Sequence, residues 1–382
     1  MIPGNHPSFM TPQARHAALG FLLCLVLLTA FGLLTGLSVS APGSAWSQLG
    51  LHCLHLALGL TVFLACLAFP VDQVRKVAPG MILLVGAVLV AMLFGLFGHE
   101  SHNAVRWIRI GPMSWQPSTF LQCLWPVVLA HWAARSPVRL QQPWQLAKLF
   151  LAFALLMVPV LMQPDLGSVL ILFTVSSITL LFAGAPVSYL RVLIPLGLGV
   201  LLLAIQLFPH VESRVTAFVN HTPDFQQVRA EEAFALGGIW GRGPGMGVMK
   251  YGAVPEGETD YVLALVAEEW GMIGTVMLWG LYVALTLFGI RLAQHAESRY
   301  GAILMASATL MLSVQAALNM AVVTGAVPPK GLPLPFVSRG GSSILALSAL
   351  LGLALRAALE KRRAQTSVEE WIPWTKSSAL AS

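Results

Sequence analysis

Charge is what this sequence lacks most. Only 10% of its 382 residues are Asp, Glu, Lys or Arg, whereas a soluble domain carries about 25%. Residues of the hydrophobic set make up 57% of the chain, and its mean hydropathy is +0.76. The shortage of charge excludes an ordinary soluble enzyme, and the high hydrophobicity excludes an intrinsically disordered chain.

Cysteine and clustered basic residues are also scarce. The four cysteines lie inside apolar runs without any CxxC pair, so neither a disulfide framework nor a cysteine metal site is expected. The formal net charge is +6, but Lys and Arg are scattered along the chain. Nucleic-acid binding needs a basic face, and none is visible. The positive balance fits control of topology at a membrane surface instead.

Long apolar runs are what the sequence has in abundance. A helix that spans a membrane needs about 20 mostly apolar residues. Ten runs qualify: 17–37, 49–69, 79–97, 117–134, 147–162, 167–185, 188–208, 260–290, 302–324 and 340–359. They predict an all-α polytopic integral membrane protein with about ten transmembrane helices. We expect a single membrane domain over 1–382, with a long extracytoplasmic loop at 209–259 and a cytoplasmic tail at 360–382.

The distribution of Lys and Arg predicts the orientation. If the N-terminus is inside, the inside segments carry fourteen of these residues and the outside segments carry eight. Four of the eight lie in the long loop, which counts for little because long segments are translocated largely regardless of their charge. Both termini are therefore predicted to be cytoplasmic. The first run lacks a convincing cleavage site, so we interpret it as a retained helix.

Three segments on the predicted outer side mix glycine, proline, charge and aromatic residues: 98–116, 209–259 and 325–343. Binding and catalytic residues are often carried by loops on a rigid scaffold. Seven glycines between 237 and 252 allow the backbone to approach a ligand closely. No GK[ST] closes this stretch, so it is not a Walker A loop. We expect an ordered lid or binding loop here rather than a flexible linker.

Four acidic residues at or near helix ends are candidates for chemistry. Asp260 stands at the entrance to the eighth predicted helix, where it can cap the helix or act as a general base. Glu268 and Glu269 follow about two turns deeper, where ionisable groups are functional candidates or pair structurally with an Arg. Asp165, in the segment 163–168, fits a cap or an inter-helix turn better than catalysis.

The last outer segment has features of an anion site. Lys330 and Arg339 flank a proline-rich bend, and the sequence Gly-Gly-Ser-Ser at 340–343 opens the tenth predicted helix. Backbone N–H groups at a helix start, with two cations nearby, suit a phosphate. A helix-breaking loop with surface cations is the alternative. A cation-rich pocket at the level of lipid headgroups would suit a lipid diphosphate.

Four segments carry a resemblance to a known family. Residues 104–118, AVRWIRIGPMSWQPS, resemble its RRWI-x-x-G-x-x-x-QPS segment, and 163–168, QPDLGS, match a hallmark of the family. Residues 254–271, VPEGETDYVLALVAEEWG, resemble PEAHTDFIFA-x-x-EELG. Residues 329–343, PKGLPLPFVSRGGSS, resemble TKG-x-x-LPF-x-SYGGSS. On these segments the chain resembles the SEDS family of FtsW, RodA and SpoVE type. LLFAGAP at 180–186 leans toward its division branch.

The resemblance implies a peptidoglycan glycosyltransferase that polymerises lipid II at the bacterial cytoplasmic membrane. It places the family's catalytic aspartate at Asp260 and the aromatic residue of its outer cleft at Trp107, which otherwise could simply anchor a helix. It also implies a class B penicillin-binding protein as partner, and it leaves room for a divalent cation, Mg or Mn. The substrate-binding candidates are Trp107, Arg106, Arg109, Gln116, Arg214, Arg229, Lys250, Lys330, Arg339, Ser342 and Ser343.

The sequence departs from the family pattern at several positions. Thr119 and Gln122 replace the acid and the lysine of QPSE-x-x-K, Arg339 replaces the tyrosine of SYGG, and Arg229 stands where a glutamine is common. A rebuilt diphosphate site and a weakened enzyme both fit these changes.

Two other functions stay open on the sequence. A lipid II flippase or transporter would need a polar path, for which Glu268 and Glu269 are the deep acids available. An inactive membrane scaffold for a class B penicillin-binding protein would explain the departures at Thr119 and Gln122.

Overall fold

The computed structural model describes residues 11–360 except 40–44, 97–98, 102–103, 111–112, 221, 223, 252 and 255–256. Apart from residue 360, the predicted cytoplasmic tail lies outside the described residues.

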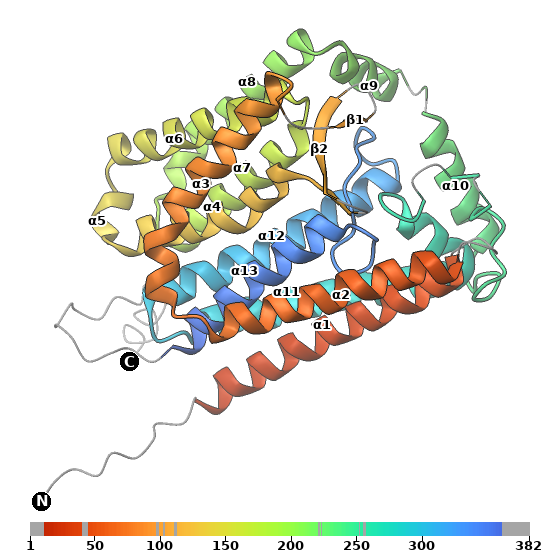
Figure 1. Ribbon diagram of the computed structural model, residues 1–382, viewed down its shortest axis with the longest axis horizontal. Coiled ribbons are helices and arrows are strands. Elements are labelled where there is room, and N and C mark those ends of the chain that lie inside the picture. The colour runs from red at the N-terminus through yellow and green to blue at the C-terminus, as the bar shows by residue number, and fades with distance from the viewer. Residues whose placement is uncertain are drawn as a thin grey trace, which may run out of the picture.

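Ten long helices coincide with the ten predicted runs (Figure 1). Eight spans among the described residues are long and apolar enough to cross a membrane, which confirms the polytopic membrane fold. Helix α7 is apolar but has only 17 residues, and α4 is not among the eight. The ten helices are α1 Pro12–Val39, α2 Ala45–Ala68, α3 Val71–Leu93, α4 Pro117–Ala134, α6 Pro143–Met162, α7 Leu166–Phe182, α8 Leu190–Leu207, α11 Val262–Gln294, α12 Arg299–Val323 and α13 Gly341–Leu359.

The helices differ in how deeply they are buried. Most of α13 and α12 lies inside the bundle, whereas α8 and α2 are mostly exposed. Leu83 and Leu84 of α3 and Leu202 of α8 are among the exposed large side chains. A soluble monomer rarely exposes so much apolar surface, so these faces are the ones that contact lipid. The polar groups needed for chemistry must therefore come from the ends of the inner helices.

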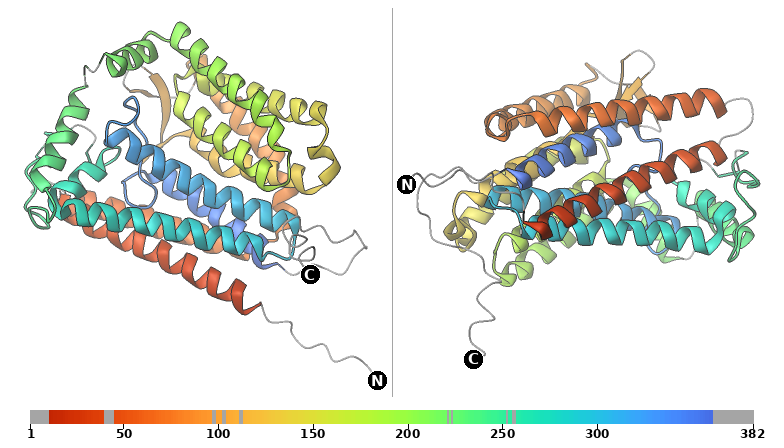
Figure 2. Two further views of the ribbon diagram at one scale, coloured as in Figure 1. Left: turned by 180° about the vertical axis from the view of Figure 1, so that it is seen from behind. Right: turned by 90° about the horizontal axis from the view of Figure 1, so that it is seen from below.

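The two ends of the bundle are built differently (Figures 1 and 2). One end holds the start of α1, the end of α13 and the short helix α5 Pro137–Leu140. The opposite end holds the small sheet, α9 Pro209–Val219 and α10 Phe225–Gly237. The three unusual segments thus share one end of the molecule.

Residues 98–116 were predicted as a loop, and that prediction was wrong for most of the segment. They form the strands β1 His99–Ser101, β2 Ala104–Ile110 and β3 Met113–Trp115, in an antiparallel sheet of order β1-β2-β3. The sequence of β2, AVRWIRI, is rich in β-branched and aromatic residues, which favour strands. The short sheet rises from the end of the helix bundle and carries Arg106 and Trp107.

Two further boundaries differ from the sequence prediction. The long loop at 209–259 contains the helices α9 and α10, and Asp224 caps α10 by accepting a hydrogen bond from the Phe225 N–H (2.7 Å). Much of this loop is therefore ordered. Helix α3 begins at Val71, eight residues before the predicted start, and continues through Pro79.

Helix α11 is broken at Gly271, whose φ of 65° and ψ of −164° are not helical. The part after the break, 272–294, rises about 34 Å, enough to cross the roughly 30 Å hydrocarbon core by itself. Backbone groups freed inside a membrane protein need partners, and the glycine-rich stretch supplies them. Four bonds join the two: Arg242 N to Glu268 O (2.9 Å), Gly243 N to Glu269 O (3.0 Å), Met272 N to Gly238 O (2.9 Å) and Ile273 N to Ile239 O (3.3 Å).

Candidate functional site

Asp260 lies half-buried just before α11. The N-cap residue of α11 is Tyr261, which makes no side-chain cap bond, so the interpretation of Asp260 as the cap was wrong. Asn319 Nδ2 of α12 donates to the Asp260 carbonyl oxygen (2.8 Å). A Cβ atom at Gly331 would come within 2.4 Å of Asp260 Oδ2. The absence of a side chain at Gly331 therefore lets the 325–340 segment touch this carboxylate.

Lys330, the neighbour of Gly331, reaches across to the junction of α6 and α7. Its Nζ lies 3.0 Å from Asp165 Oδ1, and both side chains are largely buried. Asp165 is the N-cap residue of α7. Its other hydrogen-bond donors are the Ser168 N–H (3.3 Å), Ser168 Oγ (2.6 Å), Gln116 Nε2 (3.2 Å) and Ser118 Oγ (3.3 Å). With so many donors engaged, Asp165 serves the structure.

Electrostatics keep the Asp165 carboxylate ionised. Burial raises its pKa, but Lys330, the Ser168 hydroxyl and Arg106 together outweigh burial and lower the pKa to about 2. The pKa of Lys330 is lowered. Burial and the positive charges of Arg106 and Arg214 lower it by more than Asp165 raises it. The Lys330 ammonium thus stands among charges of its own sign, which an incoming anion would stabilise.

Each of the three segments at 98–116, 209–259 and 325–343 contributes one cation to this cluster. Arg106 of β2 donates from Nε to the Gln163 carbonyl (2.5 Å) and from Nη2 to the Pro164 carbonyl (2.8 Å), which fastens the sheet to the bundle. Arg214, exposed on α9, is close enough to lower the pKa of both Arg106 and Lys330. We call Arg106, Arg214 and Lys330 the cation cluster. It adjoins Asp260 through Gly331.

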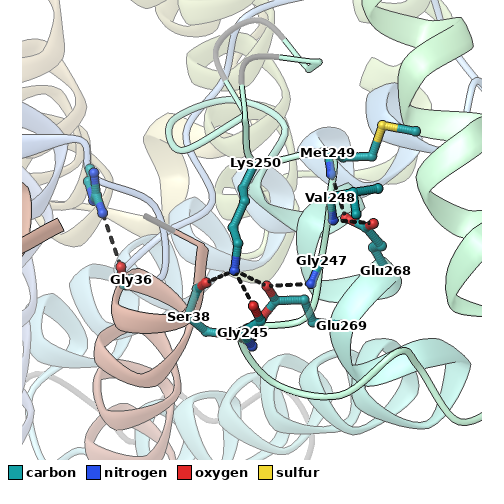
Figure 3. Close-up of polar contacts among 10 residues, drawn as sticks. Gly36, Ser38, Gly245, Gly247, Val248, Met249, Lys250, Glu268 and Glu269 are labelled. Carbon is teal, nitrogen blue, oxygen red and sulfur yellow. Dashed lines mark hydrogen bonds and ion pairs between the residues drawn. The ribbon is translucent and has the colours of Figure 1, made fainter. Parts of the chain in front are cut away.

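Lys250 was predicted to bind substrate, but the structure commits it elsewhere (Figure 3). Its Nζ contacts Glu269 Oε1 (3.2 Å), the Ser38 carbonyl (2.7 Å) and the Gly245 carbonyl (2.6 Å). Its side chain is 5% exposed, so it is not available to a phosphate.

Glu268 and Glu269 hold the glycine-rich stretch rather than a polar path. Among the described residues, Glu269 pairs with Lys250 and not with the Arg that the sequence analysis expected. Glu269 also contacts the Ser38 hydroxyl. The backbone donors are Val248 N (2.7 Å) and Met249 N (3.1 Å) to Glu268, and Gly245 N (3.0 Å) and Gly247 N (3.3 Å) to Glu269. We call Glu268, Glu269, Lys250 and Ser38 the loop clasp.

The remaining basic candidates have separate surroundings. Arg229 pairs with Glu232 on its own helix (2.6 Å), and both side chains are more than a third exposed. Arg109 is exposed on β2. Arg339 pairs with Glu258 and donates to the Gly36 carbonyl (3.1 Å).

The polar candidates mostly join elements of the scaffold. Ser342 Oγ accepts from the Gln116 N–H (3.2 Å) and donates to the Ser114 carbonyl (3.3 Å), while Ser343 accepts from Gln315 Nε2 (3.4 Å). Trp107 is half-buried on β2.

The two departures in α4 are both buried. Thr119 is 6% exposed and Gln122 is 5% exposed. Gln122 Oε1 has no hydrogen-bond partner among the residues that the structure describes.

A divalent cation held by protein side chains alone has no ligand cluster among the described residues. Across the described ranges, no three His, Cys, Asp or Glu side chains gather closely enough to hold an ion. Asp165 already accepts bonds from four side chains and one backbone N–H. The charge next to Asp260 is supplied by the cation cluster.

The geometry defines a multi-pass membrane protein in which three cations, one of them paired with Asp165, lie near the Asp260 carboxylate at one end of the bundle. Residues 17–363 match the FtsW, RodA and SpoVE family of cell cycle proteins, so the chain belongs to this family and the SEDS resemblance is confirmed.

Two bacterial proteins illustrate the similarity to curated relatives. A Coxiella burnetii protein named probable peptidoglycan glycosyltransferase FtsW is 33% identical over 356 residues, covering 88% of this chain and 95% of the relative. A Caulobacter vibrioides protein of the same name is 32% identical over 350 residues, covering 88% and 87%. The FtsW names agree with the lean toward the division branch.

Solved structures share the fold. A chain from a structure described as "Structural coordination of polymerization and crosslinking by a peptidoglycan synthase complex" has a TM-score of 0.74 and 27% identity, covering 89% of this chain and 97% of that one. Thermus thermophilus RodA, the rod shape determining protein, has a TM-score of 0.65, covering 89% and 95%. Its 24% identity supports the fold alone.

Sequence reasoning did not single out Asn319 or Gly331, which contact the backbone and the side chain of Asp260. Asn319 was hidden inside an apolar run. Gly331 was one of 34 glycines, and only its closeness to a carboxylate distinguishes it.

Proposed function

We propose that this chain is a peptidoglycan glycosyltransferase that polymerises lipid II into glycan strands at the outer face of the bacterial cytoplasmic membrane, with both termini in the cytoplasm. Family membership and the names of the relatives support the activity. The fourteen to eight distribution of Lys and Arg supports the orientation. The FtsW names support a role in cell division rather than elongation.

One observation carries the proposal most directly. The Asp260 carboxylate lies against Gly331, and the residue before Gly331, Lys330, belongs to the cation cluster. Transfer of a glycosyl group from a lipid diphosphate needs a base at the attacking hydroxyl and positive charge at the leaving group. Both are present at the same end of the bundle, and they come from segments far apart in the sequence.

In the proposed reaction, the 4-hydroxyl of an acceptor sugar attacks the anomeric carbon of the donor chain. Asp260 takes the hydroxyl proton as the new glycosidic bond forms. The bond from the anomeric carbon to the diphosphate oxygen breaks, and undecaprenyl diphosphate leaves with the electron pair. Lys330, Arg106 and Arg214 stabilise its negative charge.

The structure weakens the support for the two alternatives. A transporter would need free acids along a polar path, but Glu268 and Glu269 are occupied by backbone N–H groups and Lys250. A scaffold without activity would have no need of the arrangement around Asp260. We propose a class B penicillin-binding protein as a partner that cross-links the strands, supported by the synthase complex among the structural neighbours.

The test is to incubate the purified chain with lipid II, alone and with a class B penicillin-binding protein. We expect glycan strands. If lipid II crosses the vesicle membrane but no glycan strands form, the chain is a transporter. If neither activity is seen, with or without the penicillin-binding protein, only the scaffold function is left. Either result would reject the proposed function.

A further inference from the structure

Two segments next to the candidate base are joined by one residue pair. The Arg339 N–H donates to the Glu258 carbonyl oxygen (3.3 Å), and the Arg339 guanidinium pairs with the Glu258 carboxylate through Nη1. Nη2 of the same guanidinium donates to the Gly36 carbonyl at the end of α1 (3.1 Å). Gly36 lies at the edge of the view in Figure 3. The Arg339 side chain is 11% exposed and the Glu258 side chain is 30% exposed, so the pair is partly shielded from water.

This pair lies where it can set the position of Asp260. Glu258 precedes Asp260 by two residues, and Arg339 closes the same segment that brings Gly331 against the Asp260 carboxylate. Asn319 adds a second link, because its Nδ2 donates both to the Asp260 carbonyl (2.8 Å) and to the Leu332 carbonyl (2.5 Å). Hydrogen bonds therefore link the segment that carries Asp260 to the segment that carries Lys330.

Both partners differ from the family segments that this chain resembles. In PEAHTD the position of Glu258 is a histidine, and in SYGG the position of Arg339 is a tyrosine. The two replacements introduce opposite charges at positions that touch each other here. Either replacement alone would remove one partner of this partly buried ion pair, which is destabilising. The contact thus gives a physical reason for the two replacements to occur together.

We propose that Glu258 and Arg339 are positioning residues that hold Asp260 at the correct distance from Lys330, by an ion pair that replaces the family's histidine and tyrosine. This inference rests on the proposed function, because it takes Asp260 as the base. The pair does not touch the reacting atoms. It sets the gap between the segment of the base and the segment of the cations, where the donor diphosphate would lie.

The prediction concerns turnover more than binding. A base displaced from its hydroxyl lowers the rate of the chemical step, while the cation cluster still binds the diphosphate. Coupling between contacting residues is typically about 0.5–3 kcal/mol, and about 1.4 kcal/mol corresponds to a tenfold change. We expect Glu258→His and Arg339→Tyr each to lower kcat about tenfold with little change in KM.

The decisive experiment is a double-mutant cycle measured by lipid II polymerisation. The variants are Glu258→His, Arg339→Tyr and the two combined, with Asp72→Asn as control. Asp72 pairs with Arg75 at the start of α3, and its own side chain is 61% exposed. We expect the combined variant to recover most of the kcat lost by either single variant, and the control to match the unmodified chain. A combined variant no better than the worse single variant would overturn the proposal.

Misfolding and a failure of the proposed function are separated by two further measurements. If the single variants fail to fold, the exchanged pair Glu258→Arg with Arg339→Glu must regain both folding and part of kcat, and failure to do so rejects the ion pair. Asp260→Asn is measured in parallel. Loss of activity in that variant, with full activity in the Glu258 and Arg339 variants, rejects the positioning role alone. Full activity in Asp260→Asn rejects the base and the inference with it.

Discussion

Two lysines of this chain pair with carboxylates from distant segments, at distances that hardly differ. Lys330 lies 3.0 Å from Asp165, and Lys250 lies 3.2 Å from Glu269. The sequence presented both lysines as cations for a diphosphate. Their surroundings separate them, because the Lys330 side chain is 23% exposed and the Lys250 side chain is 5% exposed.

The surroundings also differ in the balance of charge. In the loop clasp, two carboxylates accept backbone N–H groups and a single lysine, so the site needs no further ligand. In the cation cluster, Lys330 has Arg106 and Arg214 near it as well as Asp165. The excess positive charge there favours an anion. A lysine–carboxylate pair therefore stabilises the fold in the loop clasp and forms part of an anion-binding site in the cation cluster.

The largest effect on activity is expected at Asp260, which adjoins the cation cluster and is not part of the loop clasp. Asp260→Asn keeps the shape and removes the basicity, and a general base typically contributes about 10²–10⁴-fold. We expect strand formation from lipid II to fall by that factor while the protein remains folded and binds lipid II. An Asn variant that polymerises at the rate of the unmodified chain would remove Asp260 from the mechanism.

The two lysines provide the most direct comparison. Lys330→Met should weaken lipid II binding because it removes a cation from the cluster, whereas Lys330→Arg should retain part of the binding. Lys250→Met should leave KM unchanged but lower stability, since loss of one partner of a buried ion pair costs about 3–5 kcal/mol. Binding by titration and thermal unfolding in detergent measure the two effects. The comparison fails if both variants change KM equally.

The break in α11 at Gly271 is hydrogen-bonded to the same glycine-rich stretch that the loop clasp holds, and its role can also be tested. Gly271→Ala should destabilise the fold, because Gly271 has a φ of 65° and an added Cβ would come within 2.4 Å of the Gly241 nitrogen. A residue held in such a conformation costs about 1–3 kcal/mol before the clash is counted. Gly280→Ala is the matched control, since nothing lies within 4 Å of a Cβ there. Equal melting temperatures of the two variants would contradict the anchoring of the loop.

The Asp165 pair should show a pH dependence of its own. The pKa of the Asp165 carboxyl in the folded protein, about 2, lies below its ordinary value of 3.8. The ionised carboxylate therefore contributes stability that is fully present above about pH 4. That stability is lost as the pH falls toward 2. We expect this contribution to be constant from pH 7 to 5 and to decline below 4, and we expect Asp165→Asn to remove it. Melting curves of both proteins across this range would show whether the difference between them shrinks in acid.

The smallest effect is expected at Arg229. Its pair with Glu232 is exposed, and surface pairs contribute about 0–1 kcal/mol. Arg229→Ala should leave both KM and the melting temperature nearly unchanged. A marked rise in KM would show instead that Arg229 contacts the substrate.

Sequence reasoning reached the helices because hydrophobicity is a local property. A run of about 20 apolar residues predicts a membrane helix without knowledge of its neighbours, and all ten runs coincide with long helices. The sheet at 99–115 was missed because two of its three strands have only three residues each. The break at Gly271 was missed because a single glycine inside a helical pattern is tolerated and does not by itself indicate a positive φ.

The sequence by itself determined the membrane fold, the family and the segments that gather at one end of the bundle. Only the tertiary structure decided which cation meets which carboxylate. Asp165 and Lys330 are 165 positions apart, and Ser38 and Lys250 are 212 apart. Such pairs depend on how the helices pack and where their ends meet. Local hydrophobicity constrains neither, so charges that look equivalent along the chain acquire different roles in the folded protein.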